Sequence, residues 1–232
     1  MSPPSHYVEE AQHLLPLLEP DPTRRLSLLE LGAGGGSLAF HLGRDFALTL
    51  TDRSPEMQAV SATVNPDADH RIGDLRTLDL GRQFDRVLLH DAVMYLLTEA
   101  ELAQGLATCR RHCRFDGRVV ILPDCVLETF EPETSWGGED GSNGEALRYL
   151  EWTWDPDSND TQYEVYYALV MRDAAGQTRV EGDHQRCGLF PRATWKRLIE
   201  EAGFIVTTAQ DPWRQDVFVA RPAHHPMGTS VS

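Results

Sequence analysis

Glycine residues at alternate positions follow an acidic residue in the stretch Leu28 to Leu42, LLELGAGGGSLAFHL. The order is Glu30-x-Gly32-x-Gly34-x-Gly36. Gly35 is an additional glycine outside this alternation. Glycine at this density costs backbone entropy, so a ligand that approaches the backbone closely is the expected reason. An apolar run precedes the glycines and a helical pattern follows them, which predicts a strand, a turn and a helix whose free N–H groups bind a nucleotide-like cofactor.

Other nucleotide-binding loops fit this stretch less well. The phosphate loop of nucleotide triphosphatases requires a Gly-Lys-Ser/Thr sequence, and no lysine follows these glycines. The dinucleotide fingerprint G-x-G-x-x-G/A, counted from Gly32, would end on Ser37. An acidic residue followed by alternate glycines matches at every position.

This pattern resembles the first motif, E/D-x-G-x-G-x-G, of the class I S-adenosylmethionine (SAM)-dependent methyltransferases. The resemblance runs from about Leu26 to Pro123 and resumes at the last helix and the last two strands. It implies that SAM is the cofactor and that the glycine loop binds it. The loop residues that the resemblance assigns to SAM are Glu30, Gly32, Ala33, Gly34 and Gly36.

Later motifs of the family match one at a time. Asp52 ends the second strand, where a carboxylate of the family accepts hydrogen bonds from both ribose hydroxyls. The resemblance places Arg53, Met57, Asp74 and Leu75 around the adenine, and His90, Asp91 and Tyr95 around the methionine moiety. We expect these residues at one edge of the sheet, because ligands gather outside the carboxyl ends of parallel strands.

Strand-like and helix-like segments alternate with short links from Leu26 to Pro123, which predicts a parallel sheet with helices on both faces. With the resemblance, the expected fold is α/β, a Rossmann-like class I methyltransferase fold with a seven-stranded, mostly parallel sheet. We divide the chain into 1–127 (SAM-binding core with an N-terminal helix), 128–190 (insertion), 191–221 (end of the core) and 222–232 (flexible tail).

Two local signals refine the core. Thr98 and Glu101 stand at the spacing of a capping box, which predicts the start of a long helix. The pair Asp116-Gly117 predicts a turn that leads into the next strand.

The alternation breaks after Pro123. Residues 128–144 are rich in Gly, Glu, Ser and Thr and predict a long loop, and three strand patterns follow, which predicts an antiparallel β insertion. Eleven acids and one base, Arg148, fall between Glu128 and Glu164, either as a solvated loop or as a surface that attracts a cationic acceptor. The aromatic residues of the insertion predict an acceptor cover or a homodimer interface; they are Trp136, Tyr149, Trp152, Trp154, Tyr163, Tyr166 and Tyr167.

A small molecule is the expected methyl acceptor. The fourth motif, HDAVMYL, lacks the Asn/Asp-Pro-Pro-aromatic sequence of amino-methylating DNA enzymes and the nucleophilic cysteine that cytosine-C5 methylation needs. The net charge of −15 also argues against nucleic acid as a partner. At lower specificity the chain resembles aminosugar N,N-dimethyltransferases of antibiotic pathways, which implies direct SN2 transfer to an N or O atom.

The chemistry of the acceptor decides whether a general base is needed. An amine needs only its neutral form, whereas a hydroxyl usually needs a base. His184 in the insertion and Asp91 at the sheet edge are our catalytic candidates, with His90 as a further candidate base.

Two other functions stay open on the sequence alone. A NAD(P)-dependent oxidoreductase would share the fold, but Ser37 breaks its fingerprint, and Glu99 stands where a Tyr-x-x-x-Lys pair from Tyr95 would need lysine. The other function is that of an interaction module that binds SAM without transferring methyl.

The length and composition of the chain indicate the number of domains, the cellular location and whether a metal site is expected. The 232 residues, 41% of them hydrophobic, suit one α/β domain with an insertion. No apolar run approaches the roughly 20 residues of a membrane span, and the first residues lack the features of a signal peptide, so we expect a cytoplasmic enzyme without membrane contact. Cys109, His112 and Cys113 lie close together, but no second pair completes a zinc site, so we expect no metal.

Overall fold

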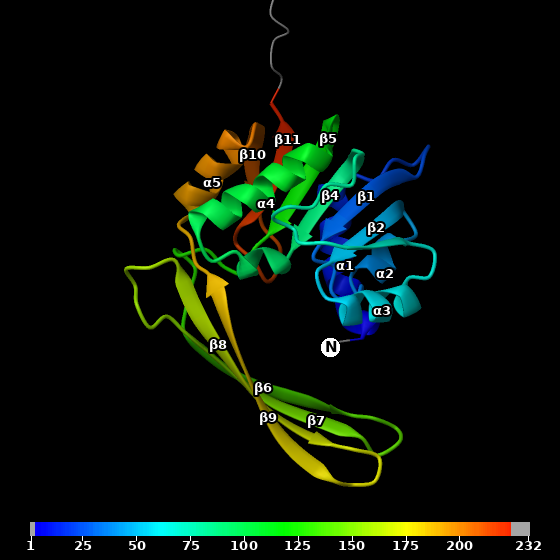
Figure 1. The fold of residues 1–232 in the computed structure, drawn as a ribbon, viewed down its shortest axis with the longest axis vertical. Helices are drawn as coiled ribbons and strands as arrows, with labels where there is room; N and C mark the ends of the chain where they lie inside the picture. The colour runs from blue at the N-terminus through cyan, green and yellow to red at the C-terminus, as the bar shows by residue number, and fades with distance from the viewer. Residues whose placement is uncertain (1–2, 224–232) are drawn as a thin grey trace, which may run out of the picture.

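The computed structural model describes residues 3–223, and Figure 1 shows a helix-covered sheet from which a second sheet projects. The main sheet has seven strands in the order β10-β11-β5-β4-β1-β2-β3. Its strands are β1 (Leu26–Leu31), β2 (Phe46–Asp52), β3 (Asp69–Ile72), β4 (Phe84–His90), β5 (Cys113–Leu122), β10 (Phe204–Ala209) and β11 (Val217–Pro222). Only the pairings of β11, with β5 and with β10, are antiparallel. The predicted seven-stranded, mostly parallel sheet is confirmed.

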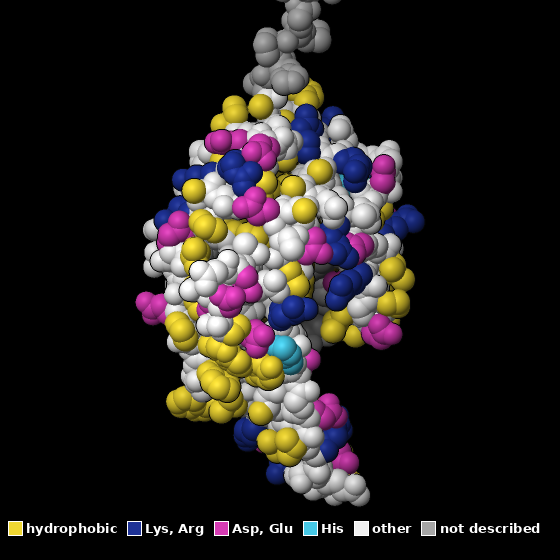
Figure 2. Space-filling view, turned by 60° about the vertical axis from the view of Figure 1, so that its left-hand side comes forward, with side chains coloured by type: hydrophobic (Ala, Val, Ile, Leu, Met, Phe, Trp, Pro, Cys, Tyr) yellow, Lys and Arg dark blue, Asp and Glu magenta, His cyan; other side chains and the backbone are white. Residues whose placement is uncertain are grey.

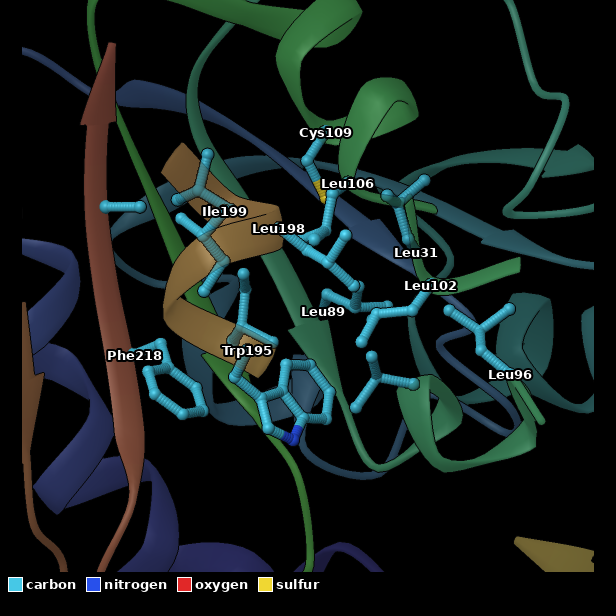
Figure 3. Packing of buried hydrophobic residues seen from close by; sticks show 14 of the residues in the cluster. Leu31, Leu89, Leu96, Leu102, Leu106, Cys109, Trp195, Leu198, Ile199 and Phe218 are labelled. Atoms are coloured by element: carbon cyan, nitrogen blue, oxygen red, sulfur yellow. The ribbon is translucent and has the colours of Figure 1, made fainter. Parts of the chain in front are cut away.

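Helices cover both faces of this sheet (Figure 1). The elements on one face are α1 (Val8–Leu18), which follows the short helix η1 (Pro4–Tyr7), α2 (Ala39–Leu42) and α3 (Pro55–Val64). On the other face lie α4 (Glu99–His112), the short helix η2 (Ala92–Tyr95) and α5 (Arg192–Glu201). Figure 3 shows the core beneath α4 and α5, where Leu106 and Trp195 pack in one buried cluster with Leu89 of β4. Within residues 3–223 no helix has both the length and the apolar character that a membrane span requires.

Helix α4 begins with the predicted hydrogen bond of Thr98, but the Glu101 side chain accepts from a different N–H group than the capping box predicts. The Thr98 hydroxyl accepts a hydrogen bond from the N–H of Glu101 at 3.2 Å, as the capping box predicts. The Glu101 carboxylate accepts in return from the N–H of Leu97, at 2.9 Å, and not from that of Thr98.

The predicted turn at Asp116-Gly117 is wrong. β5 begins at Cys113 and runs through both residues, with an irregular register opposite the start of β4. A glycine is needed here for close approach, because a Cβ on Gly117 would lie 3.0 Å from the carbonyl oxygen of Asp85 on the neighbouring strand.

The insertion forms a four-stranded antiparallel sheet in the order β6-β7-β8-β9. Its strands are β6 (Glu133–Asp140), β7 (Ala146–Trp154), β8 (Gln162–Arg172) and β9 (Thr178–Gly188). The three predicted strands are present, but the loop predicted for 128–144 contains β6. Its glycines fit close contacts with β7: a Cβ on Gly138 would lie 2.2 Å from the carbonyl oxygen of Leu147, and one on Gly137 would lie 2.9 Å from the ring of Tyr149. Pairing with β7 therefore overrides the weak strand propensity of the segment.

The end of the chain needs one further correction. The predicted tail begins at residue 222, but Pro222 is the last residue of β11 and pairs with Phe204. The remainder of the predicted tail, from residue 224, lies outside the described residues.

Candidate active site

The glycine loop follows β1 and lies against η2, which follows β4. Gly32, Gly34 and Gly36 have φ values of 74°, 53° and 73°, in the left-handed region that favours glycine. Gly35 is not among the residues with positive φ, so the alternation in the sequence marks an alternation in backbone conformation. A Cβ on Gly32 would lie only 2.2 Å from the Cβ of Ala92 in η2. Position 32 therefore requires glycine for two reasons: its φ is positive, and a side chain there would clash with Ala92.

Asp52, the last residue of β2, holds the glycine loop in place. Its Oδ2 accepts a hydrogen bond from the N–H of Gly34 at 2.9 Å, and its Oδ1 accepts one from the N–H of Ser54 at 2.9 Å. A carboxylate has about four lone-pair sites, so both oxygens can still accept a hydroxyl group of a ligand. This geometry fits the ribose contact that the sequence predicts.

A cavity of about 1070 Å³ opens at the carboxyl ends of β1, β2 and β4. It is lined by all but one of the residues that the sequence assigns to SAM, namely Gly32, Ala33, Gly34, Gly36, Asp52, Arg53, Met57, Asp74, Leu75, His90, Asp91 and Tyr95. Glu30 is the exception. We refer to this space as the cofactor cavity.

Glu30 is buried behind the loop. Its Oε2 has no hydrogen-bond partner in the described part of the chain. Burial raises the pKa of Glu30 to about 7, and the charges of Asp91 and Glu10 add to this effect. A buried acceptor without a partner beside a glycine loop fits a site that a donor from a bound ligand completes. The loop, Asp52 and Glu30 together fit SAM.

Asp74 faces the cofactor cavity with its carboxylate already engaged. Arg76 donates to it at 2.6 Å and to Glu101 at 2.6 Å. Hydrogen bonding to Arg76 lowers the pKa of Asp74 below its ordinary value. Asp74 is thus fixed as a charged acceptor at the end of the cavity where the sequence predicts the adenine.

Asp91 stands at the end of β4 with φ 44°, which is strained for a residue other than glycine. Its Oδ1 accepts a hydrogen bond from Arg214 at 3.0 Å, and Arg214 also donates to Glu10 of α1 at 2.6 Å. The imidazole of His90 lies 2.9 Å from the Glu10 carboxylate and 3.1 Å from that of Asp91. We call Glu10, His90, Asp91 and Arg214 the clamp, because they fix the strained aspartate from both ends of the chain.

The clamp decides between the candidate bases at the sheet edge. Burial opposes the charge on His90, but Asp91 and Glu10 outweigh it and raise the pKa of His90 above its usual value. The imidazole is buried, and its Nε2 already contacts both carboxylates and Arg214, so it is not placed to take a proton from a substrate. Of the two edge candidates, only Asp91 keeps a carboxylate toward the cavity.

His184 lies apart from the site. Its ring stacks on Tyr166 at a centroid distance of 4.0 Å, and its Nε2 lies 3.5 Å from Glu164. It lines neither the cofactor cavity nor the cavity beside it. His184 is therefore not placed to act as the base that the sequence suggested, because alternate residues of β9 face opposite sides of the sheet.

A second cavity, of about 680 Å³, adjoins the cofactor cavity. The residues that line both are Asp91, Tyr95, Glu151, Tyr167 and Gln185. The Tyr95 hydroxyl donates to the side-chain oxygen of Gln185 at 3.0 Å, and that of Tyr167 donates to Glu151 at 3.2 Å. The inner face of the second sheet thus meets the main sheet at this junction. We refer to the second space as the acceptor chamber.

Several residues of the site are absent from the sequence prediction. Asp124 lines the acceptor chamber and follows β5, the strand next to β4, so the rule that ligands gather at the ends of parallel strands could have found it. Glu151 and Gln185 come from the second sheet, and only its pairing register places them on the inner face. Arg214 and Glu10 are 204 residues apart and carry no local signal. Within residues 3–223, no group of three or more His, Cys, Asp or Glu side chains could hold a metal ion.

Comparison with known proteins agrees with this geometry. A family model described as a methyltransferase domain matches residues 28–117. A protein of Streptomyces fradiae, dTDP-3-amino-3,6-dideoxy-α-D-glucopyranose N,N-dimethyltransferase, is 31% identical over 202 residues, which cover 86% of this chain and 78% of that protein.

Solved structures share the fold over more than nine-tenths of this chain. DesVI of Streptomyces venezuelae superposes with a TM-score of 0.84 at 25% identity, over 94% of this chain and 92% of its own. The SAM-bound structure of CalS10, an amino pentose methyltransferase of Micromonospora echinaspora, has a TM-score of 0.75 at 22% identity, over 96% and 92%. The second likeness concerns the fold alone.

Proposed function

The chain belongs to the SAM-dependent methyltransferases, and we propose that it methylates the amine nitrogen of a small amino sugar. The relative from Streptomyces fradiae is named for such a reaction. The observation that carries the proposal is the junction of the two cavities at Asp91, which puts an acceptor beside the cofactor. Carboxylates at this junction suit an amine better than a hydroxyl group, because an amine arrives as a cation.

Family membership removes the alternatives that the sequence left open. The chain is a methyltransferase, SAM is its cofactor and a small molecule is its acceptor, so it is neither a NAD(P)-dependent oxidoreductase nor a SAM-binding module without activity. Its four cysteines are free thiols, which fits the cytoplasm that we propose as its place of action.

The residues of the chain mainly align and desolvate the reactants. SAM, when bound, supplies a methyl group on a positively charged sulfur, which is a strong electrophile. Asp52 holds the glycine loop and can orient the ribose. Asp91 and Glu151 present carboxylates that can take the proton an ammonium group must lose before its lone pair reacts. Tyr149 and Tyr167 of the second sheet line the cofactor cavity and limit the water at the junction.

Methylation of matched acceptors tests this proposal. The enzyme would be incubated with SAM and either 3-amino-3,6-dideoxy-D-glucose, free and as its dTDP conjugate, or the corresponding sugars with a 3-hydroxyl group. We expect S-adenosylhomocysteine and a mass increase of one or two methyl groups with an amine only. Methylation of the hydroxyl sugars in preference to the amines would contradict the assignment to nitrogen.

The outer face of the second sheet supports a homodimer. Trp136, Trp152 and Val180 keep 77%, 51% and 72% of their surfaces exposed. Figure 2 shows hydrophobic side chains gathered over this sheet. Large exposed apolar patches on soluble proteins mark interfaces, and one face can cover its own copy across a two-fold axis. We therefore propose that a second copy packs on this face.

Light scattering during size-exclusion chromatography tests the dimer. The wild-type chain should elute as a dimer, and the double variant Trp136→Asp/Trp152→Asp as a monomer with unchanged affinity for S-adenosylhomocysteine. A wild-type monomer at micromolar concentration would contradict the proposal.

A further inference from the structure

The side chains that line both cavities surround the place where the acceptor meets the cofactor. Two of them follow β4 and three come from the second sheet. We call this set the junction ring; it consists of Asp91, Tyr95, Glu151, Tyr167 and Gln185. What the ring can do for an amine depends on whether its oxygen atoms donate or accept hydrogen bonds.

The hydroxyl proton of Tyr95 is committed to Gln185, whose Oε1 lies 3.0 Å from the hydroxyl oxygen. The other end of the Gln185 amide fixes this direction, because its Nε2 donates to the Asp183 carboxylate at 2.9 Å. A reversed amide would place its oxygen against that carboxylate. Burial also raises the pKa of Tyr95 above its usual value, so the hydroxyl keeps its proton. The Tyr95 oxygen therefore has only lone pairs to offer a ligand.

Tyr167 is held in the same way. Its hydroxyl donates to Oε1 of Glu151 at 3.2 Å, and a carboxylate can only accept. Burial raises the pKa of Tyr167, and the charge of Glu151 adds to this effect. The second oxygen of Glu151, Oε2, lies 3.5 Å from the hydroxyl of Ser135, which donates to it. Tyr167 too presents an oxygen that accepts and a proton that is already used.

Asp91 completes the ring as a further acceptor. Its Oδ1 already accepts from Arg214 at 3.0 Å. A hydrogen bond links Asp91 with Asp124, whose pKa burial raises to about 7, so a proton held there lies between the two carboxyl groups. The oxygen atoms of the junction ring thus face the acceptor as hydrogen-bond acceptors.

Such a ring suits an amine that must react through its lone pair. A donor beside the nitrogen would occupy the lone pair, whereas acceptors hold the N–H groups and leave the lone pair free to point at the methyl group. In the transfer, the lone pair forms the bond to the methyl carbon and the electron pair of the C–S bond stays on sulfur. The surplus proton of the product then passes to a carboxylate.

We propose that the hydroxyl oxygens of Tyr95 and Tyr167 orient the acceptor amine by its N–H groups, so that its lone pair faces the methyl group of the cofactor. This inference rests on the proposed methylation of an amine and names the groups that align it. A primary amine and its monomethylated product each have an N–H group to be held. A neutral dimethylated nitrogen has none, so transfer ends at two methyl groups.

Steady-state kinetics of tyrosine variants test the proposal, with 3-amino-3,6-dideoxy-D-glucose and its dTDP conjugate as acceptors. Tyr95→Phe and Tyr167→Phe should each lower kcat about tenfold or more and change KM less than about threefold, because a misaligned amine still binds. Tyr166→Phe is the matched control, since Tyr166 lines neither cavity, and it should keep the wild-type kcat. Binding of S-adenosylhomocysteine shows that each variant is folded. Wild-type kcat in Tyr95→Phe or Tyr167→Phe, or a loss confined to KM, would overturn the inference.

Removing the partner of the Tyr95 proton gives a sharper test. In Gln185→Leu the Tyr95 hydroxyl loses its acceptor and can donate to the amine lone pair, so kcat should fall below that of Tyr95→Phe. Adding Tyr95→Phe to Gln185→Leu should restore kcat to the level of Tyr95→Phe alone. A merely structural role of the pair predicts a double variant no better than Gln185→Leu, and that outcome would overturn the inference.

The wild type separates this inference from the proposed function. If it methylates neither amino sugar, the proposed function fails and the inference fails with it. If it methylates an amino sugar and the variants keep their kcat, the inference alone fails. A mass increase of three methyl groups on the nitrogen would also overturn the inference and leave the methylation of amines standing.

Discussion

The cofactor cavity and the acceptor chamber are adjacent but are built from different parts of the chain. The part of the cofactor cavity beside the loop is shaped by backbone: three glycines with positive φ and the ends of β1, β2 and β4. Its charged side chains have both signs, as in the pairing of Asp74 with Arg76. The acceptor chamber is shaped by side chains of the second sheet and of the segments that flank it, and its charges have one sign.

This difference indicates how well each of the two cavities tolerates amino-acid substitution. A site made by backbone conformation tolerates few substitutions, because each one alters φ or the space beside the chain. A site made by side chains on a sheet can exchange them without moving the strands. The cofactor is therefore fixed by the fold, whereas the acceptor is set by residues such as Asp124 and Glu151. The following experiments test this division.

The largest effect is expected for Gly32→Ala. The new Cβ would meet Ala92 at 2.2 Å in a backbone with φ 74°, so affinity for S-adenosylhomocysteine should fall roughly 100-fold or more. Calorimetry measures this loss. Gly35→Ala is the matched control, since Gly35 is not among the positive-φ residues, and it should bind almost as the wild type does. Equal losses in both variants would contradict the importance of the alternation.

Asp52→Ala should weaken the binding of S-adenosylhomocysteine by about 10- to 100-fold. The substitution removes a charged acceptor and the hydrogen bond to the N–H of Gly34. Asp52→Asn keeps one oxygen acceptor and should lose less. Unchanged affinity of the alanine variant would tell against the ribose contact.

Asp124→Asn should abolish most of the pH dependence of acceptor binding. In the wild type, Asp124, whose pKa is raised to about 7, should lose its proton between pH 6 and pH 8 and strengthen the binding of the ammonium form of 3-amino-3,6-dideoxy-D-glucose up to about tenfold. The variant keeps only the charge of Asp91.

The groups that act on Asp124 are Asp91, His90 and Arg214. Calorimetry across this pH range, with S-adenosylhomocysteine bound, measures the difference. The same pH dependence in both chains would show that another group titrates.

The smallest effect is expected for Glu30→Gln. The folded-state pKa of Glu30, about 7, lies above its ordinary value of 4.5, so the folded chain binds the extra proton between these values. Wild-type stability should therefore fall as the pH rises from about 4.5 to about 7, and the variant should escape this loss. At pH 8 without cofactor, urea unfolding should show the variant more stable by about 1–2 kcal/mol. A gain that is as large at pH 4 would contradict the titration of Glu30.

The sequence predicted the cofactor half of the site because its determinants are local. Glu30, the glycines and Asp52 stand at fixed distances along the chain, and the strand-end rule brings them together. The acceptor half depends on which face of a strand a residue occupies. A shift of one residue in the pairing of β8 with β9 would exchange the faces of His184 and Gln185, so the sequence alone could not show that His184 lies outside both cavities.

Composition misled the prediction at β6. Its glycines and acidic residues are typical of a loop, and the contacts that make it a strand come from Tyr149 and Leu147 on β7. The turn predicted at Asp116-Gly117 failed for the same reason, because the neighbouring strand requires that glycine. Contacts with neighbouring strands determined the conformation of both segments.

The clamp has a consequence for synthesis of the chain on the ribosome. The glycine loop and the contacts described for it all lie before residue 93, so these contacts can form while the remainder is still being made. Asp91 obtains its guanidinium partner only when Arg214 has emerged, 123 residues later. Pairing over such a separation has a large loop-closure cost and belongs to the late steps of folding. The enzyme therefore completes its reaction centre only when almost the entire polypeptide is present.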